Sequence, residues 1–314
     1  MPLFARFPAL SGLPRAVLGR FPTPVEEVHA LGTSLFVKRD DLSADPLGGN
    51  KVRALEFLLG DVKPDDRIVT VGAAGSTHAL AVATYGRRLG ATVAIGRWKQ
   101  EMNSVAERVA ARIETEADAA PVFRSPVAAY AWAWRQRLTG AKWIPAGGSS
   151  PLGVLGHLNA GLELIAQIDG GMLPEPRCVV VPLGTGGTMA GLALAFAVAG
   201  RDIRVVGARV VPRVVARRRH VLGLAHGAAR LIERVTGETV PNVRADQLEI
   251  VHDAYGGAYG RETDASRRAA DGMRSAARIV LDGTYSAKAF AVAVDRAARD
   301  QTLFWLTFDS RTLA

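Results

Sequence analysis

From about residue 35 onward, short apolar runs alternate with longer amphipathic segments along the chain. Runs rich in Val and Ile predict strands, whereas apolar positions that recur at helical spacing predict helices. The predicted strands are 35–40, 67–72, 92–97, 178–183, 203–210 and 248–253. The predicted helices are 51–60, 77–89, 100–112, 126–138, 153–167, 188–199, 213–222, 226–235, 263–275 and 286–298. This alternation is typical of βαβ units, so we expect an α/β fold with parallel sheets covered on both faces.

A chain of 314 residues with 48% hydrophobic content is long enough for two compact domains. We expect a small domain over residues 53–165 and a larger domain formed by residues 1–52 and 166–314. The segment 168–177 contains two Gly and two Pro residues and is predicted to connect the two units. No charge-free apolar run is long enough for a membrane-spanning helix, so no membrane partner is predicted.

The net charge of +9 is the one feature that favours a nucleic-acid partner, because basic surfaces attract phosphate backbones. The arginines are scattered, however, and the dense cluster at 217–220 has no RNA-binding or zinc-finger signature nearby. We therefore interpret this cluster as a solvated helix face and predict no nucleic-acid partner. We assign no metal ligands.

The expected compartment is the cytoplasm. The single cysteine, Cys178, opens an apolar run and is expected to be buried, and it cannot form an intrachain disulfide. Residues 1–24 are interrupted by Pro and Arg and lack the continuous apolar stretch of an export signal.

A glycine-rich loop separates the strand 178–183 from an Ala-rich helix. The loop consists of Gly184, Thr185, Gly186, Gly187 and Thr188. Glycines let the backbone approach a phosphate closely, and the N–H groups of the first helical turn point at it. The two threonines can add hydroxyl donors. The loop therefore predicts an anion site, although a tight turn that serves only helix packing would look similar.

A dinucleotide-binding fold would also place a phosphate group at such a turn. At the end of the next predicted strand the chain has Arg209, where NAD enzymes have an acidic residue that holds the ribose. An arginine at this place suits a 2′-phosphate instead. An NADP-dependent oxidoreductase is therefore an open alternative from another reaction class.

Lys51 is the lysine best placed for covalent chemistry. The chain's lysines are Lys38, Lys51, Lys63, Lys99, Lys142 and Lys288. Lys51 follows a Gly pair and opens an amphipathic helix, where the positive field and partial burial would lower its pKa. A neutral amine is the form that attacks an aldehyde. Lys38 alternates with apolar neighbours in a predicted strand and is expected to face water, and by spacing alone Lys51 could also be a surface residue.

Five segments together resemble the D-cysteine desulfhydrase and 1-aminocyclopropane-1-carboxylate deaminase family, in the family's order and over nearly the whole chain. They are LFVKRDDLSADPLGGNKVRALEFLLGD (35–61), VTVGAAGSTHALAVATYGRRLG (69–90), VVVPLGTGGTMAGLALA (179–195), HDAYGGAYG (252–260) and LDGTYSAKAFAVAV (281–294). These are pyridoxal phosphate enzymes of the tryptophan synthase β type, or fold type II. The resemblance implies a two-domain α/β fold, a homodimer and a small amino acid substrate. It also implies that Lys51 forms the Schiff base with pyridoxal phosphate and that the GTGGT loop binds the phosphate.

The resemblance also assigns residues around the cofactor. Ser76, Thr77 and His78 match the family's substrate loop, where a serine hydroxyl and backbone N–H groups meet the substrate carboxylate. Tyr259 and Tyr285 match active-site tyrosines that pass protons or stack on a ring. The cofactor contacts it implies also include Asn50 and Thr77. Without the family, Ser76 or Thr77 could simply cap the helix, and each tyrosine could be a packing residue.

Ser286 and Thr307 bear on the substrate. They match two positions where the desulfhydrases carry hydroxyl residues, whereas the cyclopropane deaminases carry Glu and Leu. A hydroxyl beside the pyridine nitrogen gives a weaker electron sink, which fits β-elimination to a keto acid and ammonia. The chain departs from the family at Thr77, where Asn is usual, and at 306–309. Alternatives are therefore a cyclopropane deaminase, a specialised-pathway enzyme or a catalytically silent relative that binds the cofactor.

Overall fold

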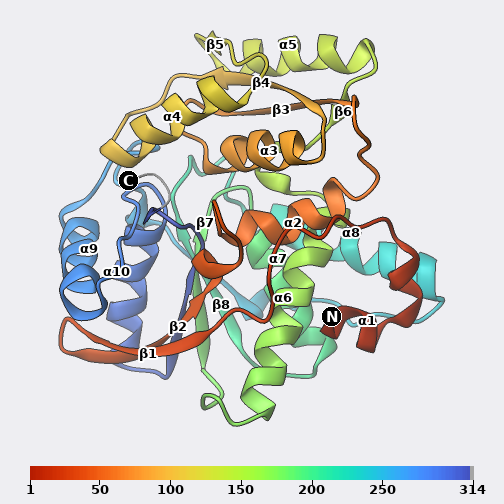
Figure 1. Ribbon diagram of the computed structural model, residues 1–314. Coiled ribbons are helices and arrows are strands. Elements are labelled where there is room, and N and C mark those ends of the chain that lie inside the picture. The colour runs from red at the N-terminus through yellow and green to blue at the C-terminus, as the bar shows by residue number, and fades with distance from the viewer. Residues whose placement is uncertain (312–314) are drawn as a thin grey trace.

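The computed structural model describes residues 1–311 and places them in two lobes, each built on its own sheet (Figure 1). The larger sheet has the strand order β1-β2-β10-β7-β8-β9, and the smaller sheet has the order β5-β4-β3-β6. β1 pairs with β2 in antiparallel fashion, and the other strand pairs in the described residues are parallel. The two-lobed α/β architecture confirms the predicted fold class.

The strands are β1 (Val25–Ala30), β2 (Thr33–Arg39), β3 (Arg67–Ala73), β4 (Thr92–Trp98), β5 (Val122–Phe123), β6 (Lys142–Trp143), β7 (Cys178–Leu183), β8 (Arg204–Arg209), β9 (Leu248–Val251) and β10 (Thr302–Leu306). The helices are α1 (Pro2–Arg6), α2 (Asn50–Leu58), α3 (Thr77–Arg88), α4 (Ser104–Glu116), α5 (Pro126–Leu138), α6 (Pro151–Asp169), α7 (Gly187–Val198), α8 (Arg218–Thr236), α9 (Asp264–Ala277) and α10 (Ser286–Ala297). Short 3₁₀ helices are η1 (Pro8–Gly12), η2 (Asp40–Leu42), η3 (Ala146–Gly148), η4 (Ala245–Gln247) and η5 (Asp253–Tyr255).

Helices cover both faces of the larger sheet, with α6, α7 and α8 on one side and α9 and α10 on the other (Figure 1). Because side chains alternate along a strand, Val179 and Val181 of β7 pack in the core on the α6–α8 side. Val180 packs in the second core with Phe290 of α10. The uninterrupted apolar run of β7 is therefore explained by burial on both faces, and Cys178 at its start is buried as predicted.

The smaller sheet lies between α5 on one face and α3 with α4 on the other (Figure 1). Its strands fall within residues 67–143, inside the range predicted for the small domain. α6, whose N-terminal part also falls in that range, packs against α2 and α7. The domain boundaries themselves remain a prediction.

One predicted break between helices and four strands differ from the structure. The predicted helices 213–222 and 226–235 are joined in a single helix, α8, which begins only at Arg218 and runs through Gly223 and Gly227. Its buried positions recur at helical spacing across both glycines, so packing overrides their low helix propensity. β1, β5, β6 and β10 were not predicted, and β5 and β6 have only two residues each. β1 carries two glutamates, and the buried run of β10 has no alternation that distinguishes a strand from a helix.

A buried ion network lies beneath α2 and joins it to the larger lobe. Arg53 of α2 donates to Asp40 Oδ2 at 2.8 Å and to Glu163 Oε2 at 3.0 Å. Lys38 Nζ donates to Glu163 Oε1 at 2.6 Å, and Trp305 Nε1 donates to Asp40 Oδ2 at 2.8 Å. The expectation that Lys38 faces water is wrong, because its side chain is 0% exposed. Arg53 is two residues after Lys51, so the network holds the helix that carries Lys51 in place.

Candidate active site

A cavity of about 330 Å³ lies between the two lobes, where the carboxyl ends of the parallel strands converge. The smaller lobe contributes the start of α3, which follows β3, and the end of β4. The larger lobe contributes the start of α2, the glycine loop after β7, the segment after β8 and the residues after β10. Open parallel sheets commonly bind ligands at this edge, so the topology marks the cavity as the candidate active site.

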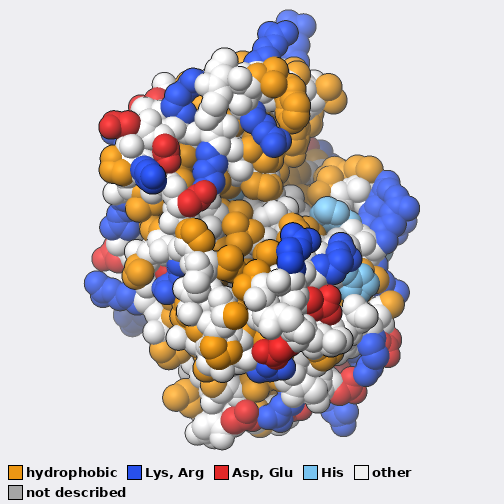
Figure 2. Space-filling model, turned by 90° about the vertical axis from the view of Figure 1, so that its right-hand side faces the viewer, with side chains coloured by type: hydrophobic (Ala, Val, Ile, Leu, Met, Phe, Trp, Pro, Cys, Tyr) orange, Lys and Arg blue, Asp and Glu red, His pale blue; other side chains and the backbone are white. Residues whose placement is uncertain are grey.

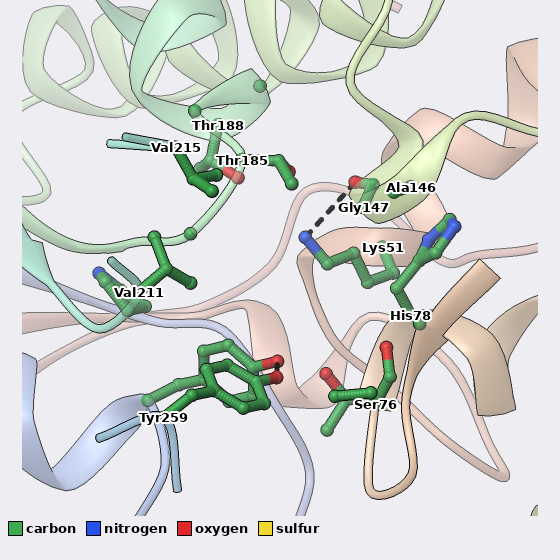
Figure 3. Close-up of a pocket in the computed structure, with 18 of the residues that line it drawn as sticks. Lys51, Ser76, His78, Ala146, Gly147, Thr185, Thr188, Val211, Val215 and Tyr259 are labelled. Carbon is green, nitrogen blue, oxygen red and sulfur yellow. Dashed lines mark hydrogen bonds between the residues drawn. The ribbon is translucent and has the colours of Figure 1, made fainter. Parts of the chain in front are cut away.

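Lys51 projects into this cavity from the first turn of α2 (Figure 3). Its Nζ lies 3.4 Å from the carbonyl oxygen of Gly147, and no carboxylate lines the cavity in the described residues. Burial in the protein lowers the pKa of the Lys51 ammonium from 10.5 to about 8. Without a negative partner to retain its proton, the amine is poised as a nucleophile or base near neutral pH.

The rate at which the cofactor-free protein captures an aldehyde should therefore depend on pH with a midpoint near 8. Because only the neutral amine attacks, we expect the capture rate to rise about tenfold per pH unit below 8 and to level off above it. Stopped-flow absorbance with pyridoxal phosphate measures this. Lys63→Ala, which changes an exposed lysine, should leave the profile unchanged. A midpoint near 10.5 would contradict the assigned desolvation of Lys51.

The glycine loop occupies the wall of the cavity opposite α3. Gly186 adopts φ +91°, a left-handed conformation that favours glycine, and caps the N-terminus of α7. The first N–H groups of a helix have no partner within it. Ser149 Oγ accepts the N–H of Gly187 at 3.2 Å and lies 2.6 Å from Thr185 Oγ1. Asn50 Nδ2 donates to Thr188 Oγ1 at 2.7 Å, which connects the loop to the start of α2.

Gly147 contacts both Lys51 and this loop and is expected to tolerate no side chain. It adopts φ +68°, and a Cβ there would lie 2.0 Å from Thr185 Oγ1. We expect Gly147→Ala to displace Thr185 and to weaken pyridoxal phosphate binding about tenfold or more, as measured by equilibrium dialysis. Gly140→Ala is the matched control, because Gly140 has φ +94° with open space around the Cβ position. Equal losses in both variants would refute a local role for Gly147.

Ser76, Thr77 and His78 form the start of α3 and line the cavity. Ser76 is the N-cap, and its Oγ accepts the N–H of Ala79 at 3.3 Å while its own hydroxyl proton remains available. His78 Nε2 lies 3.3 Å from Thr70 Oγ1. Burial, together with the nearby Lys51 charge, lowers the pKa of His78 to about 3, so its imidazole is neutral. Ser76 can thus cap the helix and still donate its hydroxyl proton within the cavity that it lines.

Tyr259, labelled in Figure 3, meets Tyr285 at the edge of the cavity, and their hydroxyl groups are hydrogen-bonded to each other. Burial raises the pKa of Tyr285, so its phenol stays protonated. Asp282 accepts the N–H groups of Tyr285 at 2.7 Å and Ser286 at 3.0 Å, which fixes the start of α10. The pair can therefore hold or relay a proton within the cavity.

The structure brings nearly all of the predicted site residues into this single cavity. Those that line it are Asn50, Lys51, Ser76, Thr77, His78, Gly184, Thr185, Gly186, Gly187, Thr188, Tyr259, Tyr285 and Thr307. Ser286 does not line it and is fully buried behind Tyr285. Thr307 accepts the N–H of Asn50 at 3.0 Å through its carbonyl oxygen, so it also holds the start of α2.

Arg209, the residue expected to bind a 2′-phosphate in an NADP enzyme, is not among the residues that line the cavity. Its guanidinium donates to the carbonyl oxygens of Val211 at 2.9 Å and His252 at 3.0 Å. It also lies 4.4 Å from the ring centroid of Tyr255. Arg209 thus supports the loops after β8 and β9.

Several residues of the site were not predicted from the sequence. Gly147 and Ser149 were not predicted, although the Gly pair in PAGGSS is a signal of special backbone geometry. Trp98 and Tyr130 also line the cavity, and nothing local in the sequence indicates this.

A second lysine, Lys288, is also buried, with 1% of its surface exposed. Burial lowers its pKa to about 8, and its Nζ donates to the carbonyl oxygen of Tyr255 at 2.8 Å. Lys288 lies outside the cavity lining.

Relatives of known name cover almost the whole chain. It is 32% identical over 307 residues to a putative 1-aminocyclopropane-1-carboxylate deaminase of Pyrococcus horikoshii, covering 94% of this chain and 90% of that protein. It is 33% identical over 317 residues to nocardicin C-9′ epimerase of Nocardia uniformis subsp. tsuyamanensis, covering 96% and 94%. D-cysteine desulfhydrase of Salmonella paratyphi A is 29% identical over 303 residues, covering 91% and 89%.

The solved structure of a 1-aminocyclopropane-1-carboxylate deaminase homologue superposes on the chain with a TM-score of 0.82 at 28% identity, covering 98% of this chain and 94% of that one. The family model described as "Pyridoxal-phosphate dependent enzyme" matches residues 17–303. This span contains Lys51, the α3 start, the glycine loop and both tyrosines. The chain therefore belongs to the family of pyridoxal-phosphate dependent enzymes.

Proposed function

We propose that the chain is a pyridoxal phosphate-dependent lyase that removes the α proton of an amino acid and expels a β substituent, after which water hydrolyses the released product to a keto acid and ammonia. A D-cysteine desulfhydrase-like reaction is the main form of this proposal, and ring opening of a cyclopropane amino acid is an alternative. One observation carries it: the Lys51 amine and the glycine loop at the start of α7 line one cavity, and no carboxylate is among the described residues of its lining.

The residues present suit pyridoxal phosphate. No atom lies within 4 Å of the position a Cβ would take at Gly184, so the loop opens onto free space. The N-terminus of α7 and the hydroxyls of Thr185 and Thr188 suit the phosphate, and Lys51 suits the aldehyde. When bound, pyridoxal phosphate supplies the electron sink that weakens the bonds at the α carbon of an amino acid.

In this proposal each wall of the cavity has a chemical role. The Lys51 amine accepts the α proton, because its lowered pKa makes the neutral form available. The N–H groups at the start of α3 and the Ser76 hydroxyl bind the substrate carboxylate. The Tyr259 and Tyr285 phenols donate a proton to the departing group, since the raised pKa of Tyr285 keeps it protonated. Thr307, which lines the cavity, is the hydroxyl residue proposed to lie beside the pyridine ring, whereas Ser286 does not line the cavity and is not assigned this contact.

Inversion at the α carbon is a second candidate function. Lys51 and the tyrosine pair project into the cavity from different walls, so protons could be removed and returned on different faces of the substrate (Figure 3). The epimerase relative, similar over nearly the whole chain, supports the same chemistry.

Titration of the purified holoprotein with D- and L-amino acids tests both candidates. The cofactor spectrum reports binding, keto acid release reports elimination, and chiral chromatography in deuterated water reports inversion. The lyase proposal expects keto acid from D-cysteine or β-chloro-D-alanine. Inversion and deuterium incorporation without keto acid would favour the second candidate. A protein whose spectrum responds to no amino acid would contradict both and would fit a catalytically silent relative.

We further propose a cytoplasmic homodimer. The family resemblance supports the dimer, and a single buried cysteine suits a reducing compartment. Among residues 1–311, no helix is both long and apolar enough to cross a membrane. Sedimentation equilibrium at micromolar concentration measures the assembly state.

A further inference from the structure

The cavity continues beyond the lysine and the glycine loop into a region bounded by uncharged side chains from both lobes. The smaller lobe contributes Trp98 at the end of β4 and Pro126 and Tyr130 of α5. The larger lobe contributes a facing group from the segment between β8 and α8. That group is Val211, Pro212 and Val215. We call these six residues the apolar mouth.

The apolar mouth lies where a substrate side chain would leave the reaction centre. Val211 and Val215 stand across the cavity from the end of the Lys51 side chain (Figure 3). On the molecular surface, hydrophobic side chains gather in the recessed band between the two lobes (Figure 2). A group attached to the β carbon of an amino acid would therefore extend from Lys51 toward hydrophobic walls.

The aromatic wall of the mouth is already ordered. The rings of Trp98 and Tyr130 are stacked, with centroids 6.2 Å apart and an interplanar angle of 22°. Tyr130 also packs against Trp143, with centroids 6.0 Å apart. Tyr130 nevertheless remains 44% exposed and Val215 37% exposed, so apolar surface on both walls faces the opening. A preorganised aromatic surface binds an apolar group at little cost in side-chain entropy.

The lining offers no partner for a second charge on the substrate. Among the described residues that line the cavity, Lys51 is the one Lys, Arg, Asp or Glu. The pKa of His78 is lowered to about 3 by burial, so this histidine is uncharged at neutral pH. A charged substrate side chain would lose its water without gaining a counter-ion.

We infer that the amino acid substrate carries an uncharged apolar group beyond its β position, an aromatic ring or a branched alkyl chain, and that the apolar mouth binds this group. This inference rests on the proposed amino acid chemistry at Lys51 and names the substrate class of the same site. It separates this chain from an enzyme whose preferred substrate is as small as cysteine.

Binding without turnover tests the inference. The holoprotein is titrated with the D and L forms of alanine, phenylalanine and glutamate, and the change in the cofactor spectrum gives each Kd. We expect one enantiomer of phenylalanine to bind at least about tenfold more tightly than the same enantiomer of alanine, because an aromatic ring is buried. Glutamate should bind more weakly than alanine. Equal or weaker binding of phenylalanine would overturn the inference.

Two variants on opposite walls locate the effect. Tyr130→Ala and Val215→Asp should each reduce the preference for phenylalanine over alanine by about tenfold. Trp134→Ala is the matched control, since Trp134 is an aromatic residue of the same helix that is 56% exposed and does not line the cavity. If Tyr130→Ala fails to fold, the Val215→Asp variant still tests whether the apolar mouth binds the aromatic ring. An unchanged preference in a folded variant would overturn the inference.

The same titration distinguishes this inference from the proposed function. If alanine and phenylalanine both change the cofactor spectrum and bind with equal Kd, the proposed amino acid chemistry stands and the apolar mouth is not a substrate site. If no amino acid perturbs the spectrum, the proposed function fails and the inference fails with it.

Discussion

Lys51→Ala is expected to abolish covalent capture of pyridoxal phosphate and to lower kcat by about 10³-fold or more, the range for loss of a nucleophile or proton-transfer group. The variant removes the amine that shares the cavity with the glycine loop. The visible band of the lysine–cofactor Schiff base should give way to that of the free aldehyde, while phosphate-driven, non-covalent affinity persists in equilibrium dialysis. Steady-state kinetics on the preferred amino acid measure the loss.

Lys288→Ala is the informative control for this prediction. Lys288 is also buried and has a pKa lowered to about 8, but its Nζ is held by the Tyr255 carbonyl and lies outside the cavity lining. We expect the Lys288 variant to keep the visible band. A Lys288 variant that lacks the Schiff-base band together with a Lys51 variant that keeps it would reverse the assignment.

Arg53→Met is expected to destabilise the fold by about 3–5 kcal/mol, the usual result of removing one partner from a buried ion network. Arg53 is 1% exposed and donates to both Asp40 and Glu163. Burial alone would raise the pKa of Asp40, but Arg53 lowers it overall, so its carboxylate remains charged inside the protein. The variant leaves two buried carboxylates with only part of their charge compensated. Urea unfolding monitored by circular dichroism measures the change.

Arg299→Ala is the matched control, because Arg299 pairs with Asp295 on the surface at 3.6 Å, with both side chains mostly exposed. Its removal should leave the urea midpoint unchanged. A loss from Arg53→Met no larger than that from Arg299→Ala would show that the network beneath α2 does not stabilise the fold. Because α2 carries Lys51, partial unfolding of α2 would also lower cofactor affinity.

The strand and helix pattern was predictable wherever burial is regular. β7, with its uninterrupted Val run, and α5, with its Pro start, were predicted with the correct bounds. The α8 glycines suggested a break because the sequence does not show that the helix packs along its whole length. Burial of Lys38 could not be foreseen, because its partners Glu163 and Gln167 are more than 120 residues away in the chain.

The residues of the candidate site were likewise predictable where the signal is local and not where it depends on distant parts of the chain. Lys51 and the loop from Gly184 to Thr188 were predicted because local chemistry and a family resemblance coincide there. Trp98 and Tyr130 were missed because, from sequence alone, an aromatic residue at a strand end or on a helix is expected to pack in the core. Only the tertiary structure shows that these two side chains line a cavity. The apolar mouth is formed by residues from both lobes, so no local sequence pattern predicts it.

Borohydride reduction of the pyridoxal phosphate-loaded protein, followed by peptide mass mapping, tests the central assignment most directly. Reduction makes the link between lysine and cofactor permanent, so the modified peptide names the lysine. We predict the label on Lys51, which faces the glycine loop across the cavity. A label on Lys288, the other buried lysine with a pKa near 8, or no label on any peptide, would contradict the account.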